Sequence, residues 1–366
     1  MGVLVLDVAP PCRRPAGTLM VRGVPRPREA VRFSLLDRDG LTGRGEALPL
    51  PGFTPDSAEA AACALEAVAA RAAAAGGLAV PETGAPAERI AAALAPFDAL
   101  LAPSPSARFA LECALLDILS RRAGLAAAAW LAKGQPLQCV PVSVLLPDDE
   151  TAIDAAAEAA ARGHGVLKLK IALPHRSPAE EDAHIAAVRA AIEAVRPGSV
   201  RLRLDANGAL PASEVTARLA ALARFGIEIV EEPCAGPALL ALPALPLPWA
   251  ADESLADPML AERLMNLPPS RGPAALVLKP ALLGLCRCLE LAEAATARGL
   301  GLIVTHAFDG DLGFAAACAL AAALPAAPWP CGLAPHAGLS HPWPEGPVLA
   351  ESCGIGLAIP GVEAAP

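Results

Sequence analysis

From about residue 140 onward, short apolar segments alternate with alanine-rich segments, and this repeat most constrains the fold. Corresponding points recur every ~20–35 residues, which is the spacing of βα units in a parallel sheet. The predicted strands are PVSVLL (141–146), GVLKLKI (165–171), VRLRLDA (200–206), IEIVEE (227–232), WAADES (249–254), ALVLKP (275–280) and GLIVTH (301–306), with a possible eighth at CGLA (331–334). So many units indicate a (β/α) barrel. The alternative is a doubly wound sheet, but no GxGxxG phosphate turn follows the early strands.

The first part of the chain has a different pattern. Residues 1–50 predict short strands joined by turns, such as VRFSLL at 31–36. From TPDS at 54–57 to about residue 133 the sequence is rich in Ala and Leu, which predicts helices, the first with a Thr or Asp cap in TPDS. The length of 366 residues suggests about two domains. Residues 10–24 contain Gly, Pro and three arginines, and they are either a lid over a site or a plain surface loop.

Charge and cysteine usage narrow the setting of the protein. The net charge of −9 argues against a nucleic-acid partner or an anionic membrane surface. The ten cysteines show no disulfide framework and the N-terminus shows no signal-peptide pattern, so we expect a cytoplasmic protein with reduced thiols. Residues 312–335 carry no charge but contain three prolines before the last position. We interpret them as a helix, a Pro-rich loop and a buried strand rather than a membrane span.

Charged residues gather at the ends of the predicted strands. The carboxylates are Asp205 in LDAN, Glu231 and Glu232 in EEP, and Asp252 and Glu253 in ADES. Active sites of such barrels form at the C-terminal ends of the strands. Three clustered carboxylates would repel one another without a cation, and oxygen ligands suit Mg²⁺. Each motif alone also fits an ordinary turn, strand exit or helix cap, and only the ordered set is specific.

The strand GVLKLKI carries two lysines where like charges are costly. Lys168 and Lys170 point to one side of the strand, and Leu167, Leu169 and Ile171 point to the other. A neighbouring ammonium and burial both lower the pKa of a lysine from its ordinary value of about 10.4, and a pKa of about 7–8 makes a general base. A base beside a cation-held carboxylate indicates proton removal next to that carboxylate, with a metal stabilising the enediolate.

The motifs LKLK, LDAN, EEP, ADES and LKP, in this order, resemble the enolase superfamily in its muconate-lactonizing-enzyme-like branch. The resemblance covers most of the chain. It implies an α/β fold, a (β/α)7β TIM-like barrel with an N-terminal α+β capping domain. The capping domain would span residues 1–105, completed by the C-terminal tail 336–366, and the barrel would span 106–335.

Within that branch, three segments look like the o-succinylbenzoate synthase family: GEALPLPGFTPDS (45–57), EEPC (231–234) and LKPALLG (278–284). This resemblance implies that Lys170 is the catalytic base and that Lys168 lowers its pKa. Lys279 would then lie on the opposite face of the substrate.

The same resemblance implies a metal site. Mg²⁺, or alternatively Mn²⁺, would be held by Asp205, Glu231 and Asp252, with Asn207 and Glu253 as supports. Strand alternation does not decide between Glu231 and the next residue, because both lie at a strand exit. The family pattern favours Glu231.

The implied reaction is the dehydration of 2-succinyl-6-hydroxy-2,4-cyclohexadiene-1-carboxylate to 2-succinylbenzoate in menaquinone biosynthesis. This is a carbon–oxygen lyase reaction on a small carboxylate substrate. Two alternatives remain open. One is an N-acylamino acid racemase or dipeptide epimerase, in which Lys170 and Lys279 alternate as acid and base. The other is a non-catalytic barrel that binds a ligand.

The seventh strand departs from the family, which often has a Ser-rich segment there. This chain has THAFDGDLG at 305–313. Thr305 can still donate a hydrogen bond, whereas Asp311 is expected to add negative charge near a substrate carboxylate. His306 is either a ligand contact or a packed residue at the strand end.

Overall fold

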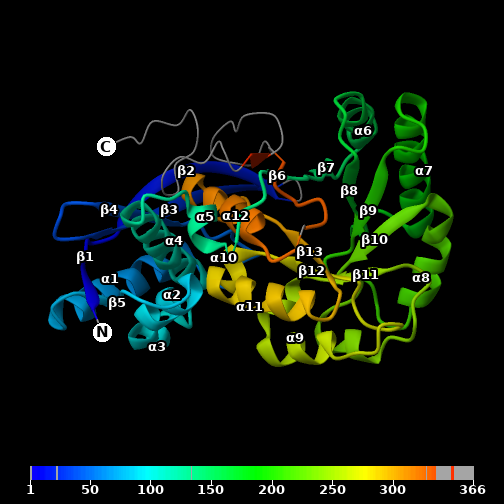
Figure 1. The fold of residues 1–366 in the computed structure, drawn as a ribbon. Helices are drawn as coiled ribbons and strands as arrows, with labels where there is room; N and C mark the ends of the chain where they lie inside the picture. Colours follow the sequence, from blue (N-terminus) through cyan, green and yellow to red (C-terminus); the bar gives the residue numbers. More distant parts are fainter. Residues whose placement is uncertain (1, 22–23, 133, 327, 335–347, 350–366) are drawn as a thin grey trace.

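The two sequence regions form two different sheets in a computed structural model of the chain (Figure 1). The structure describes residues 2–21, 24–132, 134–326, 328–334 and 348–349. An antiparallel sheet with its helices lies at the N-terminal side, and a curled parallel sheet ringed by helices lies beside it. The α/β barrel with an N-terminal antiparallel region, predicted from the sequence, is therefore confirmed.

The N-terminal sheet has the strand order β2-β3-β1-β5, with β4 paired to β3. Its strands are β1 (Val3–Val8), β2 (Cys12–Val21), β3 (Val24–Leu36), β4 (Thr42–Ala47) and β5 (Leu78–Pro81), and its helices are α1 (Ala58–Ala74), α2 (Pro86–Leu94) and α3 (Asp98–Leu101). Helix α1 begins after Ser57, whose side chain accepts a hydrogen bond from the backbone N–H of Ala60. The residues of TPDS therefore lead into a capped helix, as predicted, but the capping residue is Ser57 rather than the predicted Thr or Asp.

The interpretation of residues 10–24 as a loop is wrong for most of that segment. Strand β2 pairs antiparallel with β3, from the pair Cys12 and Arg32 to the pair Val21 and Val24. A two-strand ladder satisfies the backbone of this segment, which composition alone did not indicate. A role for the segment as a lid stays a prediction.

The parallel sheet runs in the order β13-β12-β11-β10-β9-β8-β7. Its strands are β7 (Val144–Leu145), β8 (Val166–Lys170), β9 (Arg201–Asp205), β10 (Ile227–Glu231), β11 (Trp249–Ala251), β12 (Ala275–Leu278) and β13 (Gly301–Val304). The predicted eighth strand closes the ring: Cys331 forms a parallel bridge to Val142 and Gly332 forms one to Thr305. The first and last strands are thereby joined.

Helices lie between most successive strands, as the repeat predicts (Figure 1), whereas β10 and β11 are joined through only a short 3₁₀ helix, Gly236–Ala241. The α-helices are α6 (Ala152–Ala161), α7 (Pro178–Val195), α8 (Val215–Leu222), α9 (Pro258–Met265), α10 (Pro280–Leu283), α11 (Leu285–Thr296) and α12 (Asp311–Ala323). Residues 312–335, which carry no charge, were interpreted as a helix, a Pro-rich loop and a buried strand. Helix α12 and the bridges at 331–332 confirm that interpretation. In the part of the chain that the structure describes, no helix is long and apolar enough to cross a membrane.

Side chains of the barrel strands pack into two separate apolar clusters. Leu167, Leu169 and Ile171 join the large cluster between strands and helices, together with Ile185 and Val188 of α7. A small second cluster fills the inside of the barrel, and its buried members are Ile229, Ala250, Ala275, Val277 and Ile303. The alternation of side chains along a strand explains this division.

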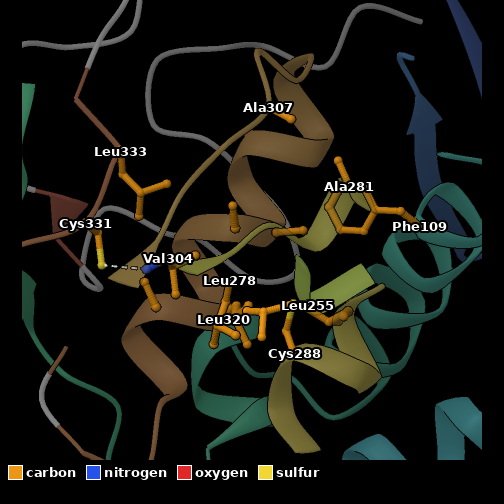
Figure 2. Packing of buried hydrophobic residues seen from close by; sticks show 14 of the residues in the cluster. Phe109, Leu255, Leu278, Ala281, Cys288, Val304, Ala307, Leu320, Cys331 and Leu333 are labelled. Atoms are coloured by element: carbon orange, nitrogen blue, oxygen red, sulfur yellow. Dashed lines mark hydrogen bonds between the residues drawn. The ribbon is translucent and has the colours of Figure 1, made fainter. Parts of the chain in front are cut away.

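Helix α4 (Pro105–Arg122) joins the two regions. It packs on β4 at two glycines, because a Cβ on Gly43 would lie 2.3 Å from the Ala114 carbonyl oxygen, and one on Gly45 would lie 1.8 Å from the Ala110 oxygen. On its other side α4 contacts the barrel helices α10 and α12. Figure 2 shows Phe109 of α4 in the same buried cluster as Ala281 of α10. The remaining helix, α5 (Ala127–Leu131), follows after a turn at Gly124.

A buried carboxyl of α4 caps a barrel helix. Glu112 is 1% exposed and accepts hydrogen bonds from the backbone N–H groups of Leu285 and Cys286, at the start of α11. Gly284 precedes them with φ 83°, and a Cβ there would lie 3.0 Å from Glu112 Oε2. Burial raises the pKa of Glu112 to about 7, against the opposing effect of the two N–H donors.

The predicted C-terminal tail is described only at β14 (Val348–Leu349), which pairs antiparallel with β6 (Cys139–Val140). The rest of residues 336–366 lies outside the described residues. Completion of the capping domain by this tail, and the division at residue 105, stay predictions.

Candidate active site

The side chains inside the barrel form rows along the strands, and these rows continue to the open end of the barrel. Four of the five buried residues of the interior cluster are followed, two positions later, by a polar or charged residue that points the same way. The pairs are Ile229 and Glu231, Ala250 and Asp252, Val277 and Lys279, and Ile303 and Thr305. The charged strand ends predicted from the sequence therefore meet at one end of the barrel.

A cavity with about 650 Å³ of space, counting its open mouth, lies at these strand ends. The barrel and the N-terminal region both line it. The lining residues are Phe53, Ser143, Leu145, Lys168, Lys170, Asp205, Asn207, Lys279, Thr305, His306, Ala307, Phe308, Gly332 and Ala334. The predicted lysines thus share one cavity with Asp205.

Lys168 bridges two of the predicted carboxylates. Its Nζ lies 3.0 Å from Asp205 Oδ2 and 2.8 Å from Glu231 Oε2. Burial acts to lower the pKa of Lys168, but the two carboxylates outweigh it and raise that pKa above its ordinary value. Lys168 is therefore a fixed ammonium. Burial acts to raise the pKa of Asp205, but the neighbouring lysines hold it below the ordinary value, whereas burial raises the pKa of Glu231.

Lys279 is held by the carboxylates at the end of the next strand. Its Nζ lies 2.7 Å from Asp252 Oδ2 and 2.7 Å from Glu253 Oε1. Asn207 Nδ2 donates to the same Glu253 oxygen at 3.3 Å. The ring of Phe53 covers the ammonium, with its centroid 4.7 Å from Nζ. Asn207 and Glu253 therefore support Lys279, a contact that the sequence motifs did not indicate.

Lys170 and Lys279 come from opposite sides of the barrel. Strands β8 and β12 are separated by β9, β10 and β11 in one direction, and by β13, the 331–332 segment and β7 in the other. Both lysines line the cavity. A molecule bound between them would thus meet an amine on each face.

The structure distinguishes the two glutamates at the end of β10. Glu231 continues the interior row of Ile229 and contacts Lys168. Glu232 has φ 37° and turns away, and its carboxylate accepts hydrogen bonds from the backbone N–H groups of Asp252 at 2.7 Å and Ser254 at 3.2 Å. Glu232 therefore shapes the ADES turn, and Glu231 lies with the other site carboxylates.

The seventh-strand segment forms one wall of the cavity. His306 lines it, packs against Phe308 and Phe314 with centroids 5.5 Å apart, and accepts a hydrogen bond at Nδ1 from the Phe308 N–H at 3.0 Å. His306 is therefore a packed residue at the strand end that also lines the cavity, and its contact with a ligand stays a prediction. Thr305 donates its hydroxyl hydrogen bond within the protein, 3.2 Å from the Gly332 carbonyl oxygen.

Asp311 is the first residue of helix α12, directly after the loop 305–310, and is not among the cavity-lining residues. Its charge adds to the rise in the pKa of Glu46, which is due first to burial. An effect of Asp311 on a substrate carboxylate stays a prediction.

Phe53 and Ser143 are among the cavity residues that were not singled out from the sequence. Phe53 stands in the PLPGF stretch, and an aromatic residue in a Pro- and Gly-containing loop was the available signal. Ser143 precedes β7, where PVSVLL resembles any buried strand, so no signal marked it.

A family model described as enolase C-terminal domain-like matches residues 151–355. An o-succinylbenzoate synthase of Desulfotalea psychrophila is 32% identical over 326 residues, covering 83% of this chain and 85% of that protein. The chain belongs to the enolase superfamily. A second o-succinylbenzoate synthase, of Thermobifida fusca, is 37% identical over 198 residues, covering 53% of this chain and 59% of that protein.

Solved structures of the enolase superfamily have the same fold. A mandelate racemase/muconate lactonizing enzyme from Roseiflexus is 26% identical with a TM-score of 0.71, covering 89% of this chain and 88% of that one. A dipeptide epimerase from Enterococcus faecalis, complexed with Mg and L-Leu-L-Tyr, is 20% identical with a TM-score of 0.73, covering 91% and 90%. At that identity the second likeness concerns the fold alone.

Members of the enolase superfamily generally use Mg²⁺. Both carboxylate oxygens of Asp252 are buried: among the described residues Oδ1 has no hydrogen-bond partner, and Oδ2 forms the ion pair with the Lys279 ammonium. Together with Asp205 and Glu231 this makes an all-oxygen set of buried carboxylates, which fits a hard cation. Within the described ranges, however, no three such side chains are grouped closely enough to hold a metal, and Lys168 contacts two of them.

Proposed function

We propose that this chain is a Mg²⁺-dependent o-succinylbenzoate synthase of menaquinone biosynthesis. It would dehydrate 2-succinyl-6-hydroxy-2,4-cyclohexadiene-1-carboxylate to 2-succinylbenzoate. The observation that carries the proposal is the 32% identity to the Desulfotalea psychrophila protein across 85% of that protein. The cavity supports the same chemistry, because Lys170 and Lys279, on opposed strands, share it with the buried carboxylate of Asp205.

Lys170 is the base in this proposal. It takes the proton from the ring carbon that bears the carboxylate, and the electron pair left behind spreads into that carboxylate as an enediolate. The ring hydroxyl then leaves as water after taking the proton from Lys170, and the ring becomes aromatic. Lys279, held by Asp252 and Glu253, supplies positive charge across the ring. Lys168 keeps Asp205 and Glu231 in place.

The carboxylates Asp205, Glu231 and Asp252 would hold the cation. When bound, Mg²⁺ supplies positive charge beside the substrate carboxylate and so lowers the cost of the negative charge created there. The chain's own contribution is a buried, oxygen-lined mouth in which that charge interacts strongly.

Loss of the diene absorbance of the substrate tests the proposal. We expect turnover with Mg²⁺, none with EDTA, and a loss of at least about 10³-fold in kcat for Lys170→Ala. Arg201→Ala is the control, because Arg201 starts the neighbouring strand β9 at the other end of the barrel and is exposed. Equal rates with Mg²⁺ and EDTA, or full activity of Lys170→Ala, would rule the proposal out.

A second candidate is racemisation or epimerisation of an N-acylamino acid or dipeptide, which the opposed Lys170 and Lys279 favour. One lysine would remove the α-proton and the other would return a proton to the opposite face. Incubation of N-succinylamino acids in D₂O distinguishes the two functions. Deuterium incorporation with inversion, without turnover of the dienoate, would support the second candidate.

A further inference from the structure

A single buried arginine of the N-terminal sheet connects two distant segments of the chain. Arg28, on β3, is 5% exposed. Its Nη2 donates to the Leu48 carbonyl oxygen at 3.0 Å, and its Nη1 donates to the carbonyl oxygen of Phe308. The two acceptors are 260 positions apart in sequence, so the planar guanidinium joins the end of β4 to the loop after β13.

Both connected segments form walls of the candidate active site. The segment that starts at Leu48 leads to Phe53, whose ring covers Lys279. The loop that contains Phe308 carries His306, and both residues line the cavity. The Phe308 N–H donates to His306 Nδ1, so the backbone of one residue, Phe308, links the guanidinium of Arg28 to the imidazole.

The backbone conformation of Phe308 explains why this residue needs the hydrogen bond from Arg28. Phe308 has φ 57°, a left-handed conformation that a bulky residue adopts at a cost in free energy. Outliers of this kind persist where the surroundings over-determine them, and they cluster at functional sites. The charged donor of Arg28 contacts the carbonyl of this same residue, and a hydrogen bond from an ionised donor is stronger than a neutral one.

The surroundings of Arg28 balance its charge and leave little free space. Glu46 and Asp309, both buried, lie near enough to stabilise the guanidinium. A Cβ on Gly310 would lie 1.5 Å from Glu46 Oε1, so the loop after β13 packs directly on β4. The loop is therefore fixed from the N-terminal sheet rather than from its own strand.

We propose that Arg28 is a positioning residue for substrate binding. It holds the Phe53 wall and the His306–Phe308 wall in a fixed relation through the Leu48 and Phe308 carbonyls, and touches no reacting atom itself. The expected effect on substrate binding rests on the proposed function, whereas the fixed relation of the two cavity walls does not.

The test compares Arg28→Met, Arg28→Lys and the control Arg122→Met by two measurements. Arg122 also joins the two regions, from α4 to Asp37 in the β3–β4 turn, but it does not line the cavity. Hydrogen exchange of the ligand-free protein, followed by mass spectrometry, should become faster in both 48–54 and 305–310 in the two Arg28 variants. Arg28→Lys keeps the positive charge, but a single ammonium nitrogen cannot donate to both carbonyl oxygens in the geometry of the planar guanidinium.

Kinetics with the dienoate give the second measurement. For both Arg28 variants we expect KM to rise by about tenfold or more while kcat changes less than about threefold, which is the pattern of weakened uniform binding. Arg122→Met should leave KM and the exchange of both segments at wild-type values.

Two results would overturn the inference. One is unchanged exchange in either segment in the Arg28 variants that fold, whatever the chain catalyses. The other is a fall in kcat with unchanged KM. If the wild-type protein does not turn over the dienoate, the proposed function fails. The exchange measurement then decides the inference alone, with faster exchange in both segments supporting it.

Discussion

The ammonium nitrogen of Lys279 lies 4.7 Å from the centre of the Phe53 ring. A side chain from the N-terminal region therefore covers a barrel lysine on the side that faces the cavity. The ring excludes water and attracts the cation, so the lysine interacts more strongly with Asp252 and Glu253.

Replacement of this ring should weaken catalysis without removing a reacting group. Because a desolvated cation–π contact is worth about 1–2 kcal/mol, we expect Phe53→Leu to lower kcat/KM by about 5- to 30-fold. Phe53→Tyr keeps the ring face and should stay near wild type. Steady-state kinetics with the dienoate measure both variants, and equal kcat/KM for leucine and phenylalanine would contradict this role.

Asp252 should couple metal binding to stability. Its Oδ1 is buried without a hydrogen-bond partner among the described residues, and its Oδ2 forms an ion pair with Lys279. We expect Mg²⁺ at about 100 times its Kd to stabilise the wild-type protein by about 3 kcal/mol in thermal unfolding, and Asp252→Asn to abolish that effect. Asp257→Asn, at the exposed cap of α9, is the control and should keep the Mg²⁺ effect, because asparagine also caps helices well. A full Mg²⁺ effect in Asp252→Asn would exclude Asp252 as a ligand.

Glu112 should make folding stability depend on pH. Burial raises its pKa from 4.5 to about 7 in the folded chain, so between these values the folded state binds a proton that the unfolded state has lost. Stability should therefore fall by up to about 3 kcal/mol as pH rises through this window and level off above it. Glu112→Gln removes this titration, so urea unfolding of both proteins at pH 4.5 and 8 gives the difference. Parallel pH profiles of the two proteins would count against the assignment.

The β4–α4 contact should not tolerate a methyl group. A Cβ on Gly45 would lie 1.8 Å from the Ala110 carbonyl oxygen, and that oxygen belongs to a helix that cannot shift alone. We expect Gly45→Ala to reduce the free energy of unfolding by about 3 kcal/mol. Gly165→Ala is the control, since nothing lies within 4 Å of its Cβ position. Urea unfolding measures the stability of both variants. Similar urea midpoints for Gly45→Ala and Gly165→Ala would show that helix α4 can move to accommodate the methyl group.

Much of this architecture follows from local sequence. The period-two rows inside the barrel, such as Val277 and Lys279, follow from strand geometry alone. Parallel strands end at the same edge, so residues as distant as Lys170 and Asp205 could be placed together from the order of the strands in the sequence. The helix, loop and strand in residues 312–335 were predictable because proline interrupts a helix and alanine favours one.

The tertiary structure alone decided the contacts between residues that lie far apart in the chain. Nothing near Arg28 indicates that its guanidinium meets Phe308, and nothing near Glu112 indicates that it caps α11. Residues 12–21 form a strand because β3 supplies the hydrogen-bonding partners for their backbone, and nothing within the segment itself indicates this. Hydrogen bonds of buried charged groups depend on which surfaces pack together, and that choice is made by the whole fold rather than by any local pattern of residues.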